Sequence, residues 1–215
     1  MAAVPLKPEY APTLGQLLSP RWHKASRPVQ RLMLLAGVAL VLGLIAIVLT
    51  LENATISRGA PVPFSFSYRQ LYETAPDPGG YAKVERRADG RLEDSFAVQP
   101  LRLPPYSGSI TGELPLYTVD YVRSLATRYR GFQLQGESKT RVNTVPGYNV
   151  FYTALVEGRR FFGRDILLLP DHPGVRDGVR IVMLSSPRAN AQVTSPMLVA
   201  TVGVLQRALH TFTFR

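Results

Sequence analysis

The chain has 215 residues, a formal net charge of +10 and a 46% share of hydrophobic residues, which together allow one membrane anchor and one globular domain. It contains no cysteine, so disulfide frameworks, cysteine nucleophiles and thiolate metal sites are excluded. The basic excess after residue 51 is spread over a long stretch rather than clustered, and we therefore expect no nucleic-acid partner. The 21 arginines against 4 lysines are typical of a GC-rich bacterial genome.

Residues 1–31 read as a basic tail with several prolines, which we expect to be flexible. Four basic residues of this tail precede an apolar segment: Arg21, Lys24, Arg27 and Arg31. Positive charge concentrates on the cytoplasmic flank of a membrane helix. These topology-determining residues predict a cytoplasmic N-terminus and an extracytoplasmic C-terminal domain.

Residues 32–51 form an apolar run of twenty residues without a charge. At 1.5 Å per residue, a helix of this length matches a hydrocarbon core of about 30 Å. A cleaved signal peptide is the alternative, but its apolar region is usually shorter, and a small-x-small cleavage pattern is missing after Leu51. The segment predicts a single-pass signal-anchor helix that is inserted in the lipid bilayer, which is the partner predicted for this part of the chain.

Small residues recur on one face of this predicted helix, at Ala36, Ala39, Gly43 and Ala46. Such a face lets two helices approach closely, so it is a candidate for packing between two copies of the chain. Small residues are also common in membrane helices that do not associate, and that interpretation stays open.

Residues 52–62 are predicted to be a linker, and residues 63–215 an extracytoplasmic domain of helices and strands. Alternating apolar and polar residues predict a strand at 64–68. Two strands, 81–87 and 91–103, flank an Asp-Gly pair that favours a tight hairpin. Extended structure is expected again at 132–144.

Three consecutive antiparallel strands are predicted next, at 148–156, 159–169 and 179–184. A helix from Ser195 to about Leu209 should be buried on most sides, because it carries few charges. The predicted fold class is therefore one N-terminal transmembrane helix plus an α+β domain, in which two main helices pack on a mainly antiparallel sheet.

The first of these two helices is predicted over 115–130, with Pro115 in its first turn. Its apolar face carries Tyr117, Tyr121 and Tyr129 at helical spacing. These tyrosines are candidates for a ligand groove, although aromatic residues at this spacing more often belong to the core.

Three features together resemble the PsbP/Mog1-like α/β/α sandwich. These are the Phe-Ser-Phe-Ser-Tyr strand at 64–68, the Thr-Val-Pro-Gly-Tyr start of the meander at 144–148, and the Thr-Phe-Thr-Phe end at 211–214. The family usually has a proline and a tryptophan after the opening strand, whereas this chain has Arg-Gln-Leu-Tyr at 69–72. The resemblance implies a non-catalytic adaptor in a larger assembly, on a membrane anchor as in bacterial relatives.

The sequence offers no pattern that identifies an enzyme, and we predict no catalytic residue, no cofactor and no metal. The histidines at 23, 172 and 210 do not form a ligand cluster. A Walker loop, a dinucleotide fingerprint and a Gly-x-Ser-x-Gly elbow are missing from the sequence.

Three functional hypotheses follow from these features. The leading one is a non-enzymatic interaction subunit that docks a membrane or envelope protein. The alternative is an extracytoplasmic domain that binds an apolar or anionic small molecule or lipid. The third is a hydrolase of envelope polymers with two carboxylates in a cleft, drawn from Glu73, Asp77, Glu113 and Asp171.

Overall fold

The computed structural model describes residues 26–51, 53–170, 172 and 174–215, which fall into two units, one up to residue 50 and one from residue 51 onward. The first unit holds the helix α2 (Arg27–Leu51). Among the described residues, α2 is the one helix whose length and apolar composition would suffice to cross a membrane. It starts five residues before the predicted segment, so Arg27 and Arg31 lie in its first turns, where both are exposed.

The predicted tail and packing face are only partly within the described residues. Arg21 and Lys24 lie outside them. On α2, Ala36, Ala39 and Ala46 are exposed and Gly43 is half-buried. Packing of this face against a second copy stays a prediction.

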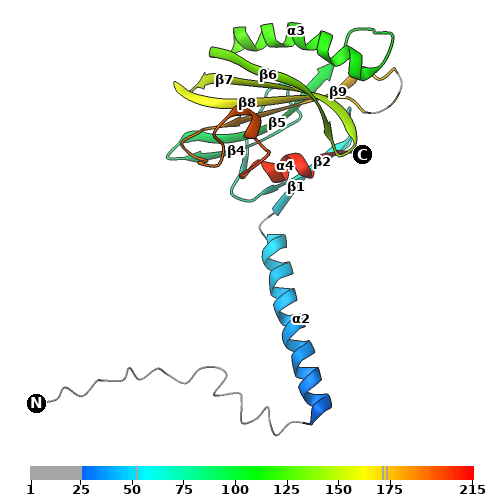
Figure 1. Cartoon of the computed structure of the whole chain (residues 1–215), viewed down its shortest axis with the longest axis vertical. Coiled ribbons are helices and arrows are strands. Elements are labelled where there is room, and N and C mark those ends of the chain that lie inside the picture. Colours follow the sequence, from blue (N-terminus) through cyan, green and yellow to red (C-terminus); the bar gives the residue numbers. More distant parts are fainter. Residues whose placement is uncertain (1–25, 52, 171, 173) are drawn as a thin grey trace, which may run out of the picture. The chain divides into compact units, whose positions relative to one another are not determined.

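The second unit is built on a seven-stranded antiparallel sheet in the order β3-β4-β5-β9-β8-β7-β6 (Figure 1). Its strands are β3 (Glu73–Thr74), β4 (Ala82–Ala88), β5 (Arg91–Arg102), β6 (Arg130–Val142), β7 (Val145–Val156), β8 (Arg159–Leu168) and β9 (Asp177–Ser185). The six predicted strands of this region, from 81–87 to 179–184, are confirmed as β4 to β9. The hairpin turns at Asp89-Gly90 and Glu157-Gly158 have positive φ at both residues, as a two-residue turn between twisted strands requires.

One helix, α3 (Ile110–Arg128), packs on one face of this sheet, against β6 and β7 (Figure 1). A cluster of buried apolar residues fills the interface, including Leu114 and Leu125. The predicted start at Pro115 is wrong, because the helix begins five residues earlier and the proline lies inside it. Burial of Leu114 at 1% exposure holds the backbone helical at a residue that a following proline disfavours.

The opposite face of the large sheet is covered by a three-stranded sheet, β1-β2-β10, and the short helix α4 (Gln206–His210) (Figure 1). The strands are β1 (Asn53–Arg58), β2 (Phe64–Arg69) and β10 (Thr213–Phe214). Aromatic rings form much of this second core, with the centroids of Phe66 and Phe96 4.8 Å apart. Residues 53–58, expected as part of a linker, instead form β1 and pair with β2.

The second predicted main helix is wrong. The segment from Ser195 to Leu209 contains only the 3₁₀ turn η1 (Pro196–Leu198) and the five-residue α4. Ala200 and Gly203 have φ values of 58° and 78°, which a right-handed helix does not allow. The chain turns at these two residues, and Val199 before them and Leu205 after them are buried at 0% and 2% exposure. The sandwich therefore has one long helix on one face, and on the other a three-stranded sheet with short helical turns in place of a second long helix.

Candidate functional site

An open groove lies on the α3 face of the large sheet, beside the helix. Because α3 packs on β6 and β7, the β4, β5 and β9 part of this face forms a floor without a helix above it. The groove has a volume of about 550 Å³, which is in the range of ligand pockets in proteins. Its rim is formed by the turn at 77–80, the turn at 156–157 and the C-terminal end of α3.

The groove floor comes from strand register. Gln99 on β5 lies opposite Arg180 on β9, and Ala97 lies opposite Val182. Gln99 donates from Nε2 to the Asp77 carboxylate at 3.0 Å, while its Oε1 is buried without a hydrogen-bond partner among the described residues. Arg180 Nε is likewise buried and has no hydrogen-bond partner among the described residues. The floor thus holds one unmet acceptor and one unmet donor on neighbouring strands.

Four basic and two acidic side chains line the groove: Lys83, Arg87, Arg128, Arg180, Asp77 and Glu157. Lys83 and Arg87 are paired with acids: both contact Glu85, at 2.8 and 2.6 Å, and Arg87 also contacts Glu157 at 3.0 Å. Within the part of the chain that the structure describes, Arg128 and Arg180 form no ion pair. The groove is therefore basic at the end near α3.

A buried polar network underlies that end of the groove. Asp165, in the middle of β8, is 0% exposed and accepts hydrogen bonds from Tyr121 Oη at 2.5 Å and Tyr152 Oη at 3.0 Å. Burial raises the pKa of Asp165 to about 6, against the opposing effect of the two tyrosine hydrogen bonds. Burial also raises the pKa of Tyr121 and Tyr152, so both stay protonated and act as donors.

This Asp165 network, formed by Asp165, Tyr121 and Tyr152, positions the basic end of the groove. The guanidinium of Arg180 lies over the Tyr121 ring, 5.6 Å from its centroid. Tyr129, the residue after α3, stacks on Tyr152 with a centroid distance of 5.6 Å and lines the groove. The network thus fixes the groove side of α3 from within the core.

The three tyrosines predicted as a ligand groove occupy different environments. Tyr121 is buried at 3% exposure and belongs to the core. Tyr117 is half-buried and stacks on Tyr121 at 6.4 Å. Tyr129 is the one of the three that lines the large groove. Strand residues form most of the floor, so helix periodicity alone could not locate it.

Asp165 and its neighbour Arg164 were not identified from the sequence as candidate site residues. Both lie within the apolar strand β8, on opposite faces, at 0% and 9% exposure. The available signal was an adjacent acid and base in the middle of the run 161–169, which is otherwise Phe, Gly, Ile and Leu. Charged side chains are almost never buried without a partner, so such a pair marks a polar site inside the core.

The carboxylates proposed for hydrolysis lie on separate elements. Asp77 lines the groove, whereas Glu73 lines another cavity beside Glu85, and Glu113 lies in the first turn of α3. Asp171 lies outside the described residues. Among the described residues, no group of three or more histidine, aspartate or glutamate side chains could hold a metal ion.

The domain resembles solved structures from bacterial proteins. It superposes on LpqN, a protein involved in cell envelope biogenesis of Mycobacterium tuberculosis, with a TM-score of 0.51 at 9% identity, over 76% of this chain and 90% of LpqN. A cyanobacterial PsbP protein from Synechocystis matches with a TM-score of 0.48 at 12% identity, over 77% of this chain and 94% of that protein. The domain has a PsbP-like fold.

The predicted resemblance is thus confirmed for the fold. At this level of identity the likeness establishes the arrangement of elements and not an activity. No family model matches the sequence, and no curated protein matches it. Function must therefore be argued from the groove and its charges.

Proposed function

We propose that this chain is a non-enzymatic, single-pass membrane protein of a bacterial cell envelope, whose extracytoplasmic domain docks an acidic segment of a partner protein in the groove beside α3. The apolar helix α2 and the fold shared with LpqN, an envelope biogenesis protein, support this placement. The observation that carries the docking proposal is the pair of groove arginines, Arg128 and Arg180, which form no ion pair among the described residues, although the buried Asp165 beneath them attracts both charges.

The groove suits a polypeptide better than a simple anion. A simple carboxylate supplies only acceptors, whereas the groove lining combines the acids Asp77 and Glu157 with the arginines Arg128 and Arg180. A peptide unit carries one donor and one acceptor, so an extended acidic segment offers both kinds of group and the negative charge. Arginine and tyrosine at the α3 end are the residue types most often found at the centre of protein interfaces.

Neither Glu157 of the groove nor the buried Asp165 beneath it provides the protonated acid that a hydrolase needs. Glycoside hydrolysis requires one carboxylic acid that stays protonated near neutral pH. The pKa of Glu157 is lowered, first by the hydrogen bond from the Leu92 amide and then by Arg87, so this acid stays ionised. Asp165 has a raised pKa, but it is fully buried and both its oxygens accept from tyrosines. A non-enzymatic role agrees with this arrangement.

Reversing the charge of Arg128 should remove the partner protein. We expect Arg128→Glu to reduce crosslinked partner by about tenfold or more, because a like charge facing the partner's acidic groups costs several kcal/mol. The measurement is crosslinking of the full-length protein in native membranes, mild extraction and mass spectrometry of co-purifying proteins. Arg123→Glu is the matched control, since Arg123 is on the same helix with a 76% exposed side chain and does not line the groove.

Two outcomes would contradict the docking proposal. One is that no protein is enriched with the wild-type chain over membranes lacking it. The other is that the same protein is recovered equally well with Arg128→Glu and with Arg123→Glu, which would place the interface elsewhere on the molecule.

The proposed orientation has a direct test, because the chain contains no cysteine. A single Ser109→Cys substitution lies in an exposed loop of the domain and should react with a membrane-impermeant maleimide in cells with an intact cytoplasmic membrane. A Ser19→Cys substitution in the tail should react only after permeabilisation. Labelling with the reverse pattern would place the domain in the cytoplasm.

A further inference from the structure

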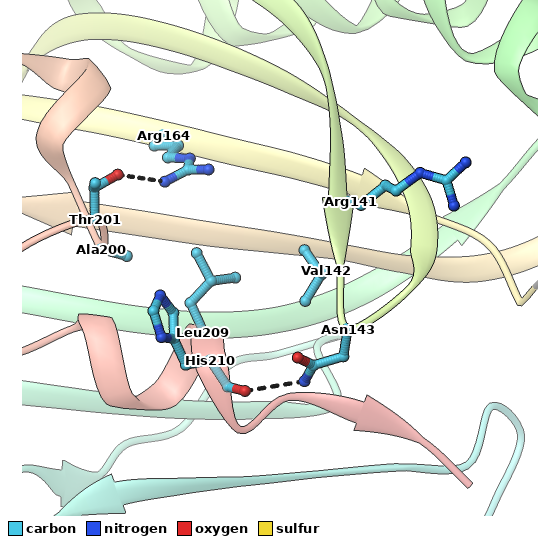
Figure 2. A pocket seen from close by; sticks show the side chains of 8 residues that line it. All are labelled: Arg141, Val142, Asn143, Arg164, Ala200, Thr201, Leu209 and His210. Carbon is cyan, nitrogen blue, oxygen red and sulfur yellow. Dashed lines mark hydrogen bonds between the residues drawn. The ribbon is translucent and has the colours of Figure 1, made fainter.

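A second cavity lies on the opposite face of the large sheet, away from the groove. It has a volume of about 300 Å³ and lies between the end of β6, strand β8, the segment around Ala200 and helix α4. Figure 2 shows that the Arg164 guanidinium and the side chains of Leu209 and His210 are directed toward the same space, with Val142 beside it. The Arg141 side chain, also part of the lining, is turned away from the others.

Arg164 forms the polar base of this cavity. Its Nε donates to Asn149 Oδ1 at 3.1 Å, and its Nη1 donates to the Val199 carbonyl at 3.0 Å. Nη1 also donates to Thr201 Oγ1 at 3.1 Å (Figure 2). No hydrogen bond joins its Nη2 to any residue within the described ranges. The second terminal nitrogen therefore has free donors on the side chain that lines the cavity.

The charge of Arg164 has no counter-charge in the part of the chain that the structure covers. The residue is only 9% exposed, and none of the ion pairs among the described residues includes it. All three of its acceptors are neutral, and burial lowers the pKa of the guanidinium. A buried charge is costly unless it is paired, because it has lost its hydration.

The surroundings of Arg164 favour a negative ligand. Of the eight lining residues none is acidic, and the imidazole of His210 is directed toward the same space as Arg164. Val142, Ala200 and Leu209 give the cavity an apolar wall. A guanidinium nitrogen with unused N–H groups is well suited to bind carboxylate or phosphate oxygens.

We propose that this cavity binds the oxyanion group, phosphate or carboxylate, of a small molecule, with Arg164 Nη2 as the direct donor and the apolar wall in contact with the rest of the ligand. A purely structural Arg164 would explain the bonds that hold the segment at 199–201 to the sheet. The Phe151 ring, with its centroid 5.5 Å from the guanidinium carbon, partly offsets the charge of Arg164, but it supplies neither a counter-ion nor an acceptor for the donors of Nη2. The cavity shares no lining residue with the groove, so this proposal does not depend on the docking proposal.

The test is isothermal titration calorimetry on the full-length protein in detergent, at constant ionic strength, with three probes. Inorganic phosphate and acetate represent free anions, and dihexanoyl phosphatidic acid represents a lipid headgroup. We expect saturable binding of at least one probe, and about tenfold or greater weakening in Arg164→Gln, since a hydrogen bond to a charged group contributes enough for that ratio. Binding of the phospholipid alone would assign the site to a headgroup.

A second variant keeps the test independent of folding, because Arg164→Gln also breaks three internal hydrogen bonds. His210 is exposed, and no hydrogen bond of its side chain is present among the described contacts. His210→Glu should therefore fold normally by circular dichroism and lose binding, because it adds a negative charge to the cavity. Arg207→Gln, an exposed charge on the same helix outside the cavity, should bind like wild type.

The proposal would be overturned if none of the three probes binds the wild-type protein saturably. It would also be overturned if a probe binds wild type and His210→Glu with the same affinity, since the bound anion would then lie outside this cavity.

Discussion

Replacing Asp165 with alanine should lower the free energy of unfolding by about 4 kcal/mol. The substitution removes the acceptor of two tyrosine hydroxyls, and both tyrosines are buried, at 3% and 0% exposure. Each buried hydroxyl left without a partner costs about 1–3 kcal/mol, and the missing carboxyl leaves additional empty space in the core. Urea unfolding of the full-length protein in detergent, followed by far-UV circular dichroism, measures this change.

The matched control is Asp177→Ala, which removes an acid of β9 whose side chain is 64% exposed. We expect its stability to stay within about 0.5 kcal/mol of wild type, as is usual for surface substitutions. Adding Tyr121→Phe and Tyr152→Phe to Asp165→Ala should restore part of the loss, because no buried hydroxyl is then left unpaired. Equal stability of Asp165→Ala and Asp177→Ala would show that the Asp165 network does not hold α3 to the sheet.

The Asp165 network also contributes to the proposed function, because it holds the basic end of the groove in place. It joins α3 to β7 and β8 directly below the basic end of the groove, where Arg128, Tyr129 and Arg180 lie. A network with all its members satisfied fixes one arrangement of a core, since each alternative packing leaves a polar group unpaired. We therefore expect Asp165→Ala to weaken partner docking as well as stability.

Local sequence signals were sufficient to predict most strands of the large sheet. The hairpins at 88–91 and 156–159 follow from Asp-Gly and Glu-Gly pairs, because these residues accept the positive φ that the turns adopt. The strands between these turns are rich in apolar residues, as in β8 and β9, where most consecutive residues are buried on both faces of the sheet. These signals span a few residues and do not depend on the rest of the chain.

The elements that sequence reasoning missed depend on distant contacts. Residues 199–205 are apolar enough for a buried helix, but the chain turns at Ala200 and Gly203, which have positive φ. The groove floor pairs Gln99 with Arg180, and the second cavity combines β8 with residues near Ala200 and His210. Only strand order and register bring such residues together, and neither is encoded in a short segment.

Between about pH 4 and pH 7, the wild-type protein should lose about 3 kcal/mol of stability that the Asp165→Asn variant retains. Burial raises the pKa of Asp165 from 3.8 to about 6 in the folded state. In this window the folded protein holds a proton that the unfolded chain has released, so stability is greatest below pH 4 and falls as pH rises through 6. A shift of about two pKa units corresponds to about 3 kcal/mol.

The asparagine variant isolates this effect, because its amide has one acceptor and one donor group, like the protonated acid, but does not titrate. Other groups act in the opposite direction: the lowered pKa values of Glu85 and Glu157 make their contributions to stability grow as pH rises through the acid range. These contributions are common to both proteins and cancel in the difference between their urea unfolding curves. The difference should therefore widen from pH 4 to pH 6 and stay constant above it. Parallel stability curves over the whole range would mean that Asp165 titrates at the same pH in the folded and unfolded chains.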